Sequence, residues 1–315
     1  MRVVPLEAIR DKIPLAMAVA AVERAFRALA LDEATLPDPM VVELREADAE
    51  IHVKAAHLAG SRHIVLKVAT GFYRNRARGL PSGDGMFLLL DATTGVPDLL
   101  LEEHGYLTDL RTAAAVALTL KYLAPRDVTE ALLVGAGALA RLVARAIVAE
   151  RPIERLTLWN RTPERAQVLA RELKGVVDTR IAGALEPEVR HHRLIVTATA
   201  STSPLIRAGW VAPGTHVTSV GTGSPGKVEL EPALLAQADK LVVDRLVQAE
   251  RFGNLRSALA AGALQRSAVY GELGALTAGR LAGRESASEI TIADLTGVGV
   301  QDAAIAQVVV QVLEL

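Results

Sequence analysis

The sequence has no cysteine, few aromatic residues and no excess of either sign of charge. The lack of cysteine excludes disulfides, thiolate nucleophiles and thiolate metal sites, and suits a reducing compartment. Its 35 Lys and Arg residues nearly balance 36 Asp and Glu residues, which argues against nucleic acid or an acidic membrane as a partner. The seven histidines show no metal-ligand spacing, so we expect no metal site.

Long apolar runs are also missing. None reaches the length needed to span a membrane. The run at residues 15–22 could be mistaken for a signal peptide, but charged residues continue it in helical period, so we interpret it as a helix. We therefore expect a cytoplasmic protein.

The chain has 315 residues, about twice the common domain size, which favours two domains. The first part predicts an antiparallel α+β domain, because a helix is followed by β-type runs and then by a long helix at residues 108–122, with Thr108 as its N-cap. From residue 130 short apolar runs alternate with amphipathic helical segments, which is typical of a doubly wound parallel sheet. The expected strands of the two domains cover residues 40–44, 51–56, 64–69 and 86–90, and then 131–134, 156–159, 194–198, 216–220 and 241–243. A last apolar helix at residues 305–313 is expected to return to the first domain.

A glycine-rich turn follows the first strand of the second domain. Gly135 allows a tight turn, Gly137 lets backbone amides approach a diphosphate, and Ala140 permits close packing of the helix on the strand. The order of apolar strand, turn and helix favours a dinucleotide site over an empty tight turn. The cofactor-binding residues expected here are Gly135, Ala136, Gly137, Ala138 and Leu139.

The second strand of this domain ends in Asn160, Arg161 and Thr162 and not in an acidic residue. An acid there would bind the ribose 2′-hydroxyl, whereas an arginine can bind a 2′-phosphate. The sequence therefore predicts that NADP(H) is preferred and NAD(H) possible, with a solvated Arg161 as the alternative. At later strand ends we expect further cofactor contacts from Thr197, Ala198, Thr199 and Val220, although small polar residues suit plain turns as well.

Several motifs together resemble the ornithine cyclodeaminase and mu-crystallin family. They are LKVATG from Leu66, GLPS from Gly79, LTDLRTAA from Leu107, GTGSPGKVEL from Gly221, YGELGALTAG from Tyr270 and EITIADLTGVGVQD from Glu289. The resemblance covers nearly the whole chain and implies a Rossmann domain with a discontinuous α+β domain. We also count Ser82 and Thr112, which lie in these motifs, among the expected cofactor contacts.

The resemblance implies that Lys67 and Arg111 hold an amino-acid or imino-acid substrate. From the residues alone, Lys67 lies in the middle of an apolar strand, where an unpaired charge would cost several kcal/mol. A substrate carboxylate, or proton transfer at a lowered lysine pKa, would compensate it. The alternatives for Lys67 are a structural ion pair or a position at the sheet edge. Arg111 could instead contact the cofactor phosphate, or pair with Asp109 or Asp127.

Two positions depart from the family pattern. The family's first-strand arginine is Met40 here, which leaves Arg45 as a possible substitute in substrate binding. The aspartate that cyclodeaminases carry in the PGK-type motif is Gly223, which cannot transfer protons. A reductase of a preformed cyclic imine needs only hydride, one proton and a clamp for the carboxylate.

The sequence therefore predicts an NAD(P)H-dependent reductase of small cyclic ketimine carboxylates, with Lys67 and Arg111 as its catalytic residues. A cyclodeaminase or amino-acid dehydrogenase is the alternative of the same class. A cofactor-bound binding or regulatory protein of the mu-crystallin type is the alternative of another class. We assign residues 1–122 with 297–315 to substrate binding and dimerisation, and residues 123–296 to NAD(P) binding. The expected partners are a small imino or amino acid and a second copy of the chain.

Overall fold

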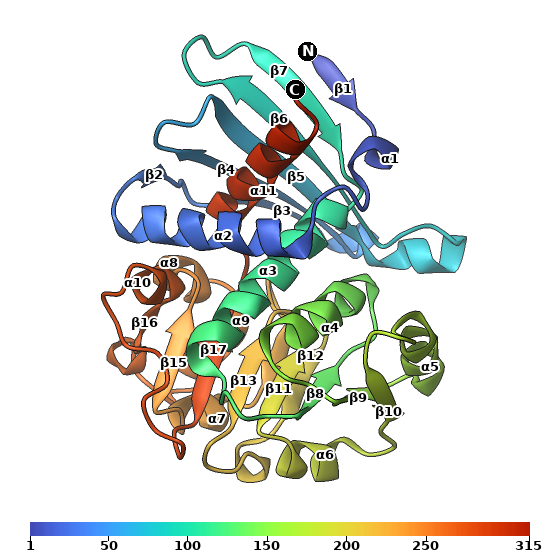
Figure 1. Cartoon of the computed structure of the whole chain (residues 1–315), viewed down its shortest axis with the longest axis vertical. Helices are drawn as coiled ribbons and strands as arrows, with labels where there is room; N and C mark the ends of the chain where they lie inside the picture. Colours follow the sequence, from blue (N-terminus) through green and yellow to red (C-terminus); the bar gives the residue numbers. More distant parts are fainter. The chain divides into compact units, whose positions relative to one another are not determined.

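A computed structural model describes residues 1–315, apart from the side chain of Arg76. The chain forms two compact units, which Figure 1 draws in one picture. Unit 1 comprises Met1–Ala114 and Val298–Leu315, and unit 2 comprises Ala115–Gly297. The sequence places the first boundary at residue 122, at the end of the long helix α3 (Tyr106–Leu123), whereas the structural division falls inside that helix.

Unit 1 is built on a seven-stranded sheet. All of its pairs are antiparallel except the parallel pair of β1 with β7. Helix α11 (Gly299–Val312) packs against β4, β5 and helix α2 (Leu15–Ala30), so the C-terminal helix does return to the first domain. The predicted α+β class is confirmed, but the sequence missed the edge strand β1 and its neighbour β7. The strand order is β1 (Arg2–Val4), β7 (Pro97–Glu102), β6 (Gly83–Asp91), β5 (His63–Phe72), β4 (Ala49–Leu58) and β2 (Ala34–Thr35), with β3 (Met40–Leu44) also paired to β4.

The start of α3 differs from the prediction. The helix begins at Tyr106, and Thr108 lies inside its first turn. The cap is Glu103, whose carboxylate accepts hydrogen bonds from the amides of Leu107 (2.7 Å) and Thr108 (3.2 Å) and from the Thr108 hydroxyl (3.0 Å). A carboxylate at this end also interacts favourably with the helix dipole. The prediction that Thr108 is the N-cap was therefore wrong.

Unit 2 contains an eight-stranded sheet in which every pair is parallel. The chain runs outward from β8 through β9 to β10, then returns to the other side of β8 with β11, so the order reverses between β8 and β11. This is the doubly wound topology that the alternating runs predicted. The strand order is β10 (Asp178–Ile181), β9 (Arg155–Trp159), β8 (Glu130–Val134), β11 (Leu194–Thr197), β13 (His216–Ser219), β17 (Thr291–Asp294), β15 (Lys240–Val243) and β16 (Gly271–Glu272).

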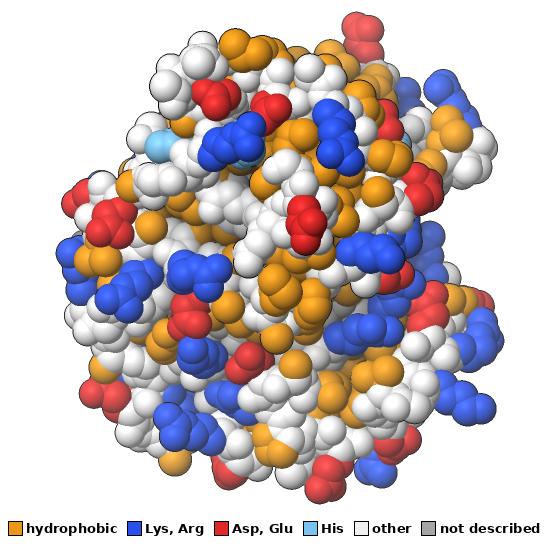
Figure 2. Space-filling view, turned by 45° about the horizontal axis from the view of Figure 1, so that its top comes forward, with side chains coloured by type: hydrophobic (Ala, Val, Ile, Leu, Met, Phe, Trp, Pro, Cys, Tyr) orange, Lys and Arg blue, Asp and Glu red, His pale blue; other side chains and the backbone are white. Residues whose placement is uncertain are grey.

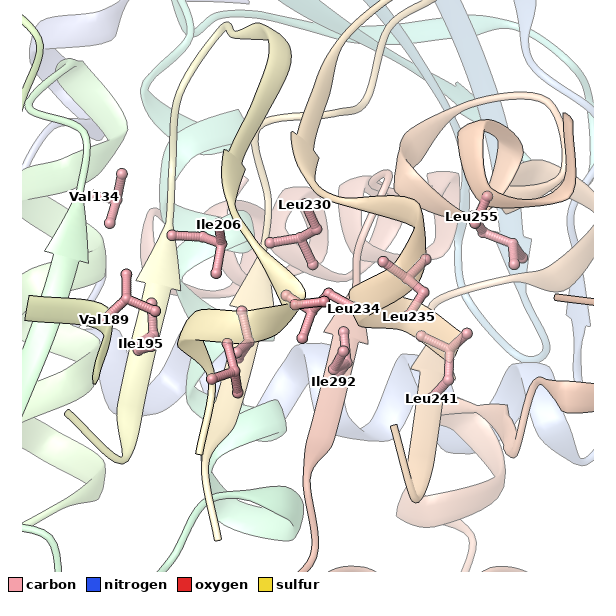
Figure 3. Packing of buried hydrophobic residues seen from close by; sticks show 14 of the residues in the cluster. Val134, Val189, Ile195, Ile206, Leu230, Leu234, Leu235, Leu241, Leu255 and Ile292 are labelled. Carbon is pink, nitrogen blue, oxygen red and sulfur yellow. The ribbon is translucent and has the colours of Figure 1, made fainter. Parts of the chain in front are cut away.

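Apolar residues from strands and helices cover one face of this sheet. Figure 3 shows part of this cluster, with Ile292 of the sheet next to Leu234 of a covering helix and Ile195 of the sheet near Val189 of another. Because parallel strands are buried on both faces, their sequences are continuous apolar runs, which is why the pattern was visible in the sequence. The helices of unit 2 outside α3 are α4 (Ala138–Glu150), α5 (Pro163–Glu172), α6 (Leu185–His191), α7 (Pro232–Ala236), α8 (Leu246–Ala249), α9 (Gly253–Ala260) and α10 (Leu273–Thr277); the short strands β12 (Thr202–Ile206) and β14 (Val228–Leu230) pair with each other.

The surface view shows Lys and Arg side chains interspersed with Asp and Glu (Figure 2), as the near-zero net charge implies. Among the described helices, none combines the length and apolar character that crossing a membrane requires.

Candidate active site

The glycine-rich turn lies where the strand order of unit 2 reverses. Gly135 follows β8 with a φ of 117°, and a Cβ built on it would lie 2.4 Å from the carbonyl oxygen of Ala198. Its amide donates to the carbonyl of Trp159 at 2.8 Å. Only glycine fits this backbone. The structure thus brings two predicted cofactor residues, Gly135 and Ala198, into contact at the carboxyl edge of the sheet, where such folds bind their ligands.

Gly137 begins the helix that follows. It is the N-cap of α4, and because it has no side chain it does not cap the first amides of the helix. A Cβ built on it would meet nothing within 4 Å, so the space beside it is open. The turn borders a groove of about 320 Å³, lined by Ala136, Gly137 and Ala138. A helix N-terminus with uncapped amides and open space beside it suits a diphosphate. The residues present therefore fit the dinucleotide that the sequence predicts.

The predicted 2′-phosphate residues lie after β9. Asn160 donates its side-chain amide to the carbonyl of Thr162 at 2.8 Å, and Arg161 is exposed to solvent. Two arginines that the sequence analysis did not select, Arg141 and Arg165, line the groove beside the turn. The structure therefore offers Arg165 as well as Arg161 for an anionic group.

A buried carboxylate joins the strand ends near the turn. Glu229 accepts hydrogen bonds from the hydroxyl of Thr197 (2.8 Å), the amide and hydroxyl of Thr199 (2.6 and 2.7 Å), the hydroxyl of Ser219 (2.7 Å) and the amide of Gly221 (2.9 Å). Hydrogen bonds to a charged group are stronger than neutral ones. Glu229 thus fixes the two loops that carry the predicted contacts at 197–199 and 220.

Gly223 packs tightly against the backbone. A Cβ at this position would lie 2.8 Å from the carbonyl oxygen of Thr296. The place at which cyclodeaminases carry an aspartate is therefore closed to any side chain unless the backbone shifts.

Unit 1 contains a separate cluster of buried charges. Lys67 on β5 is 1% exposed, and its Nζ donates to Oδ1 of Asp302 on α11 at 2.9 Å. Burial and then the nearby Arg111 lower the pKa of Lys67 from its usual value. An ion pair was one of the alternatives for Lys67, and the structure shows one. A lysine with a lowered pKa is also suited to proton transfer.

Arg111 on α3 contacts the same carboxylate oxygen. Its Nε lies 3.0 Å from Oδ1 of Asp302, but the described residues give this Nε no well-formed hydrogen bond, and Oδ2 of Asp302 is likewise buried without one. Burial raises the pKa of Asp302, and the cations Lys67 and Arg111 outweigh this and bring it below its usual value. Buried polar atoms without partners are costly, so these two are places where a polar ligand would bind. Asp127, one of the alternatives drawn from the sequence for Arg111, pairs instead with Arg193 at 3.0 Å.

Arg45 does not join this cluster. It begins the 3-10 turn Arg45–Ala47 after β3, its side chain is 90% exposed, and it lies 3.7 Å from Glu43. The register sets the neighbouring Ala49 opposite Phe72, five residues along β5 from Lys67. That is about 17 Å of strand at about 3.4 Å per residue. Arg45 thus lies just beyond the end of β3, and its distance argues against a role beside Lys67 in substrate binding.

Three other predicted positions lie apart from these contacts. Met40 is exposed on β3, where it pairs with Val53. Ser82 accepts the amide of Phe72 through its carbonyl, and the Thr112 hydroxyl donates to the Thr108 carbonyl at 2.7 Å. Cofactor contacts from Ser82 and Thr112 stay predictions.

Sequence reasoning missed Asp302 and Glu229. Both lie in motifs that were noted, GVGVQD and GKVEL, and an acid inside an apolar segment was the available signal. Among the described residues, no group of three or more His, Asp or Glu side chains is arranged to hold a metal ion.

The fold and site define a class: a doubly wound dinucleotide-binding domain combined with an α+β domain that buries a cluster of charges. The chain belongs to the ornithine cyclodeaminase/mu-crystallin family, whose sequence profile matches residues 3–314.

Individual relatives agree with this assignment. An uncharacterized cyclodeaminase of Sinorhizobium fredii is 40% identical and covers 99% of this chain and 95% of its own. The Delta(1)-pyrroline-2-carboxylate reductase of Thermococcus litoralis, solved with NADH and L-proline, superposes with a TM-score of 0.94 at 27% identity, over 99% of this chain and 97% of that one. The iminosuccinate reductase of Paracoccus denitrificans, solved with NAD⁺, gives a TM-score of 0.89 at 33% identity, over 100% and 96%.

Proposed function

We propose that this protein is an NAD(P)H-dependent reductase of small cyclic ketimine carboxylates. Pyrroline-2-carboxylate and piperideine-2-carboxylate are the first candidate substrates, and the products are the cyclic amino acids. The observation that carries the proposal is the buried cluster of Lys67, Arg111 and Asp302, in which Arg111 Nε and Asp302 Oδ2 have no hydrogen-bond partner among the described residues. Relatives that are named as imino-acid reductases support it.

The nicotinamide dinucleotide, when bound, supplies the hydride. In this proposal the amides after Gly137 hold its diphosphate, and Gly135 keeps the turn close to Ala198. Glu229 holds Thr197 and Thr199 in position at the neighbouring strand end. Two of the structural relatives contain NADH or NAD⁺, so NAD(H) is a candidate beside the NADP(H) that Arg161 favours.

Arg111 and Lys67 would act on the substrate. A guanidinium binds a carboxylate through paired hydrogen bonds, so Arg111 is assigned to the substrate carboxylate. Lys67 either shares that carboxylate or gives a proton to the imine nitrogen, which its lowered pKa favours. The imine carbon gains the hydride and the nitrogen keeps the proton, so the C=N bond becomes a C–N single bond. Asp302 positions both cations through one oxygen.

The closed position at Gly223 favours reduction over cyclodeamination. A cyclodeaminase must also move protons while it releases ammonia and closes a ring, and the glycine supplies no group for this. The space that an aspartate would need is occupied by the carbonyl of Thr296. A reductase acting on a preformed imine has no such requirement.

The test is to add either imine to the protein with NADPH, then with NADH, and to follow the loss of reduced-cofactor absorbance. We expect turnover, and we expect Lys67→Met and Arg111→Met to reduce kcat/KM by about 100-fold or more. The exposed Lys12→Met is the matched control and should behave as the wild type. Ammonia released from ornithine at a rate above imine reduction would overturn the proposal.

A binding or regulatory protein with little turnover is the second candidate. Met40 and Gly223 favour it, because both replace polar side chains of the family pattern. Tight dinucleotide binding by calorimetry, with no imine or amino acid converted, would select it. Homodimer formation through unit 1 and a cytoplasmic location remain predictions, and sedimentation of the purified protein tests the first.

A further inference from the structure

Glu103, directly after β7, is a buried acid to which the proposed reaction gives no role. It is 0% exposed. Its Oε2 accepts the amides of Leu107 and Thr108, and its Oε1 accepts the hydroxyl of Thr108. The first amides of a helix have no partner within the helix, so this carboxylate completes the first turn of α3. A neutral serine or threonine can also cap a helix, without the cost of burying a charge. The use of an acid here therefore calls for a second explanation.

The carboxylate of Glu103 lies across the neighbouring strand β6. Glu102 pairs with Met86 in the register of β7 and β6, so the next residue, Glu103, lies beside Gly85. A Cβ built on Gly85 would be 2.5 Å from Oε1 of Glu103, which is closer than non-bonded atoms approach. The carboxylate thus occupies the space in which a side chain at residue 85 would lie. The glycine allows the acid to extend over β6.

Lys67 lies one strand further on, on the same face of the sheet. Gly85 pairs with Ala69 of β5, and Ala69 is two residues from Lys67, so the side chains of both project from that face. Neighbouring strands are about 4.8 Å apart, and the acid reaches over a residue that has no side chain. The next row, in which Lys67 pairs with Phe87 and Phe87 with Leu101, has both apolar residues at 0% exposure. Water screens charges little in such surroundings, so the acid can act on the lysine.

The same acid also fixes the position of Arg111. Arg111 lies four residues after Leu107 and three after Thr108, and residues at these spacings are neighbours on one side of a helix. The hydrogen bonds of Glu103 to Leu107 and Thr108 therefore set the turn from which Arg111 projects. Nε2 of Gln301 donates to the carbonyl of Arg111 at 3.4 Å, which holds the next turn. A guanidinium that binds a carboxylate through paired hydrogen bonds tolerates little displacement.

Several titratable groups face Lys67, and they come from four elements besides its own strand. They are His52 and Lys54 on β4, Arg111 on α3, Asp302 on α11 and Glu103 after β7. Burial lowers the pKa of Lys67 most and Arg111 lowers it further, whereas Asp302 and Glu103 raise it. Asp302 does so in direct contact, while Glu103 acts through space from the end of β7.

We propose that Glu103 is a positioning residue of the active site, which fixes Arg111 through the first turn of α3 and supplies negative charge to Lys67 across Gly85. Lys67 acts as an ammonium group both when it binds a carboxylate and when it gives a proton, so both roles depend on that charge. Gly85 belongs to the arrangement because a side chain there would displace the carboxylate. This inference rests on the proposed function and adds two residues to the same site.

The pH dependence of imine reduction tests the charge of Glu103. In the wild type kcat/KM should fall at high pH, as Lys67 loses its proton. Glu103→Gln keeps the size of the side chain and removes its charge, so we expect this fall to move to lower pH. Glu103→Asp keeps the charge and should restore most of the wild-type profile. A purely structural cap would change the rate at all pH values alike, so an unmoved profile in Glu103→Gln would contradict the inference.

Gly85→Ala tests the geometry while every charged group stays in the protein. The new methyl group would clash with Oε1 of Glu103, so the carboxylate must move off β6. A displacement of about 1 Å can cost about 100-fold in rate, so we expect kcat/KM to fall about 10- to 100-fold. The fall at high pH should also move in the same direction as in Glu103→Gln.

Gly83→Ala is the matched control for this variant. Gly83 lies on the same strand and face as Gly85, but a Cβ there would meet only the carbonyl oxygen of Thr70 at 3.6 Å, an ordinary contact. We expect Gly83→Ala to keep the wild-type rate and pH profile. Equal behaviour of the two alanine variants would overturn the role of Gly85.

A binding measurement separates this inference from the proposed function. Pyrrole-2-carboxylate resembles the first candidate imine, but its aromatic ring cannot be reduced at an imine. Calorimetry of the NADPH-loaded protein in two buffers of different ionisation enthalpy gives its affinity and the protons taken up on binding. We expect Glu103→Gln to bind it more weakly and to take up more protons than the wild type, because Lys67 is then more often neutral before the carboxylate arrives.

Each outcome of the binding experiment decides between the two claims. Equal affinity and proton uptake in the wild type and Glu103→Gln would reject the inference even if imines are reduced. The expected differences, together with no turnover of any imine, would reject the proposed function and leave the positioning role of Glu103 in place. A wild type that does not bind pyrrole-2-carboxylate would count against both.

Discussion

The two sheets of this protein place their buried ionisable residues differently. The parallel sheet of unit 2 has apolar residues such as Leu132 and Leu133 within β8, and its buried ionisable residues lie at strand ends, as Asp294 does on β17. The antiparallel sheet of unit 1 instead buries Lys54 and Lys67 within its strands. Charges at strand ends are a property of the fold, since ligands of doubly wound sheets bind at those ends. Charges within a strand are costly, so they indicate a functional site.

The largest expected effect concerns the cluster of unit 1. Asp302→Asn removes the carboxylate that both Lys67 and Arg111 contact, which leaves two buried cations. Breaking a buried ion pair costs about 3–5 kcal/mol. We expect faster hydrogen exchange in β5 and α11, and loss of imine reduction. The exposed Glu314→Gln is the matched control.

Tryptophan fluorescence allows the unfolding of unit 2 to be followed separately. Both tryptophans, Trp159 and Trp210, lie in unit 2, so their fluorescence reports on that unit. The Asp302→Asn variant should change hydrogen exchange of unit 1 more than it changes the tryptophan unfolding curve. Equal changes in both would mean that the cluster does not act within unit 1.

Two glycine variants test whether Gly135 and Gly137 have different roles in the turn of unit 2. Gly135→Ala forces a side chain into left-handed backbone and against the carbonyl of Ala198, whereas Gly137→Ala enters open space. The first should destabilise unit 2 by about 1–3 kcal/mol through backbone strain, with the clash adding to it. The second should leave tryptophan unfolding unchanged but weaken dinucleotide binding, measured by calorimetry. Identical behaviour of the two variants would refute this separation of roles.

Asp294, at the end of β17, is expected to make the stability of the protein depend on pH. Burial raises the pKa of Asp294 from 3.8 to about 6, although Leu255, Asn254 and Thr222 donate to its carboxylate. Because the folded-state pKa lies above the unfolded value, its contribution to stability is present below about pH 4 and is lost as pH rises through about 6. Relative to Asp294→Asn, the wild type should gain about 2–3 kcal/mol between about pH 7 and about pH 4. Urea unfolding followed by tryptophan fluorescence measures it, and a difference independent of pH would contradict the assignment.

The smallest expected effect concerns cofactor choice. Arg161 is exposed after β9, and Arg165 lines the groove beside the glycine turn. If Arg161 binds the 2′-phosphate, Arg161→Ala should weaken NADPH binding by about 10- to 100-fold and leave NADH binding nearly unchanged. Arg165→Ala is the matched comparison. A larger NADPH effect from Arg165→Ala would transfer the role to that residue.

The contrast between the sheets also explains what could be predicted from the sequence. The turn at Gly135 is a local signal, because strand, glycines and helix follow one another within a few residues. Five of the eight parallel strands, β8, β9, β11, β13 and β15, were predicted to within a few residues, whereas β10, β16 and β17 were missed. The edge strand β1 is three residues long and has no such pattern.

The contacts of the site could not be predicted in the same way. Lys67 and Asp302 are 235 residues apart in sequence, and the helix that carries Asp302 is almost wholly buried, so its acid gave no periodic signal. Glu229 presents the same difficulty, since its five donors come from two other segments of the chain. The cap of α3 was missed because Thr108 is a common N-cap type, whereas Glu103 reaches the helix from outside it.

The central claim is that hydride passes from a reduced nicotinamide to the carbon of a substrate imine. Mass spectrometry tests this directly when pyrroline-2-carboxylate is incubated with the protein and with NADPH or NADH that carries deuterium at the transferred position. We expect proline with one deuterium on its α carbon, and much less of it from Lys67→Met. Proline without deuterium, or no proline formed from pyrroline-2-carboxylate, would contradict it.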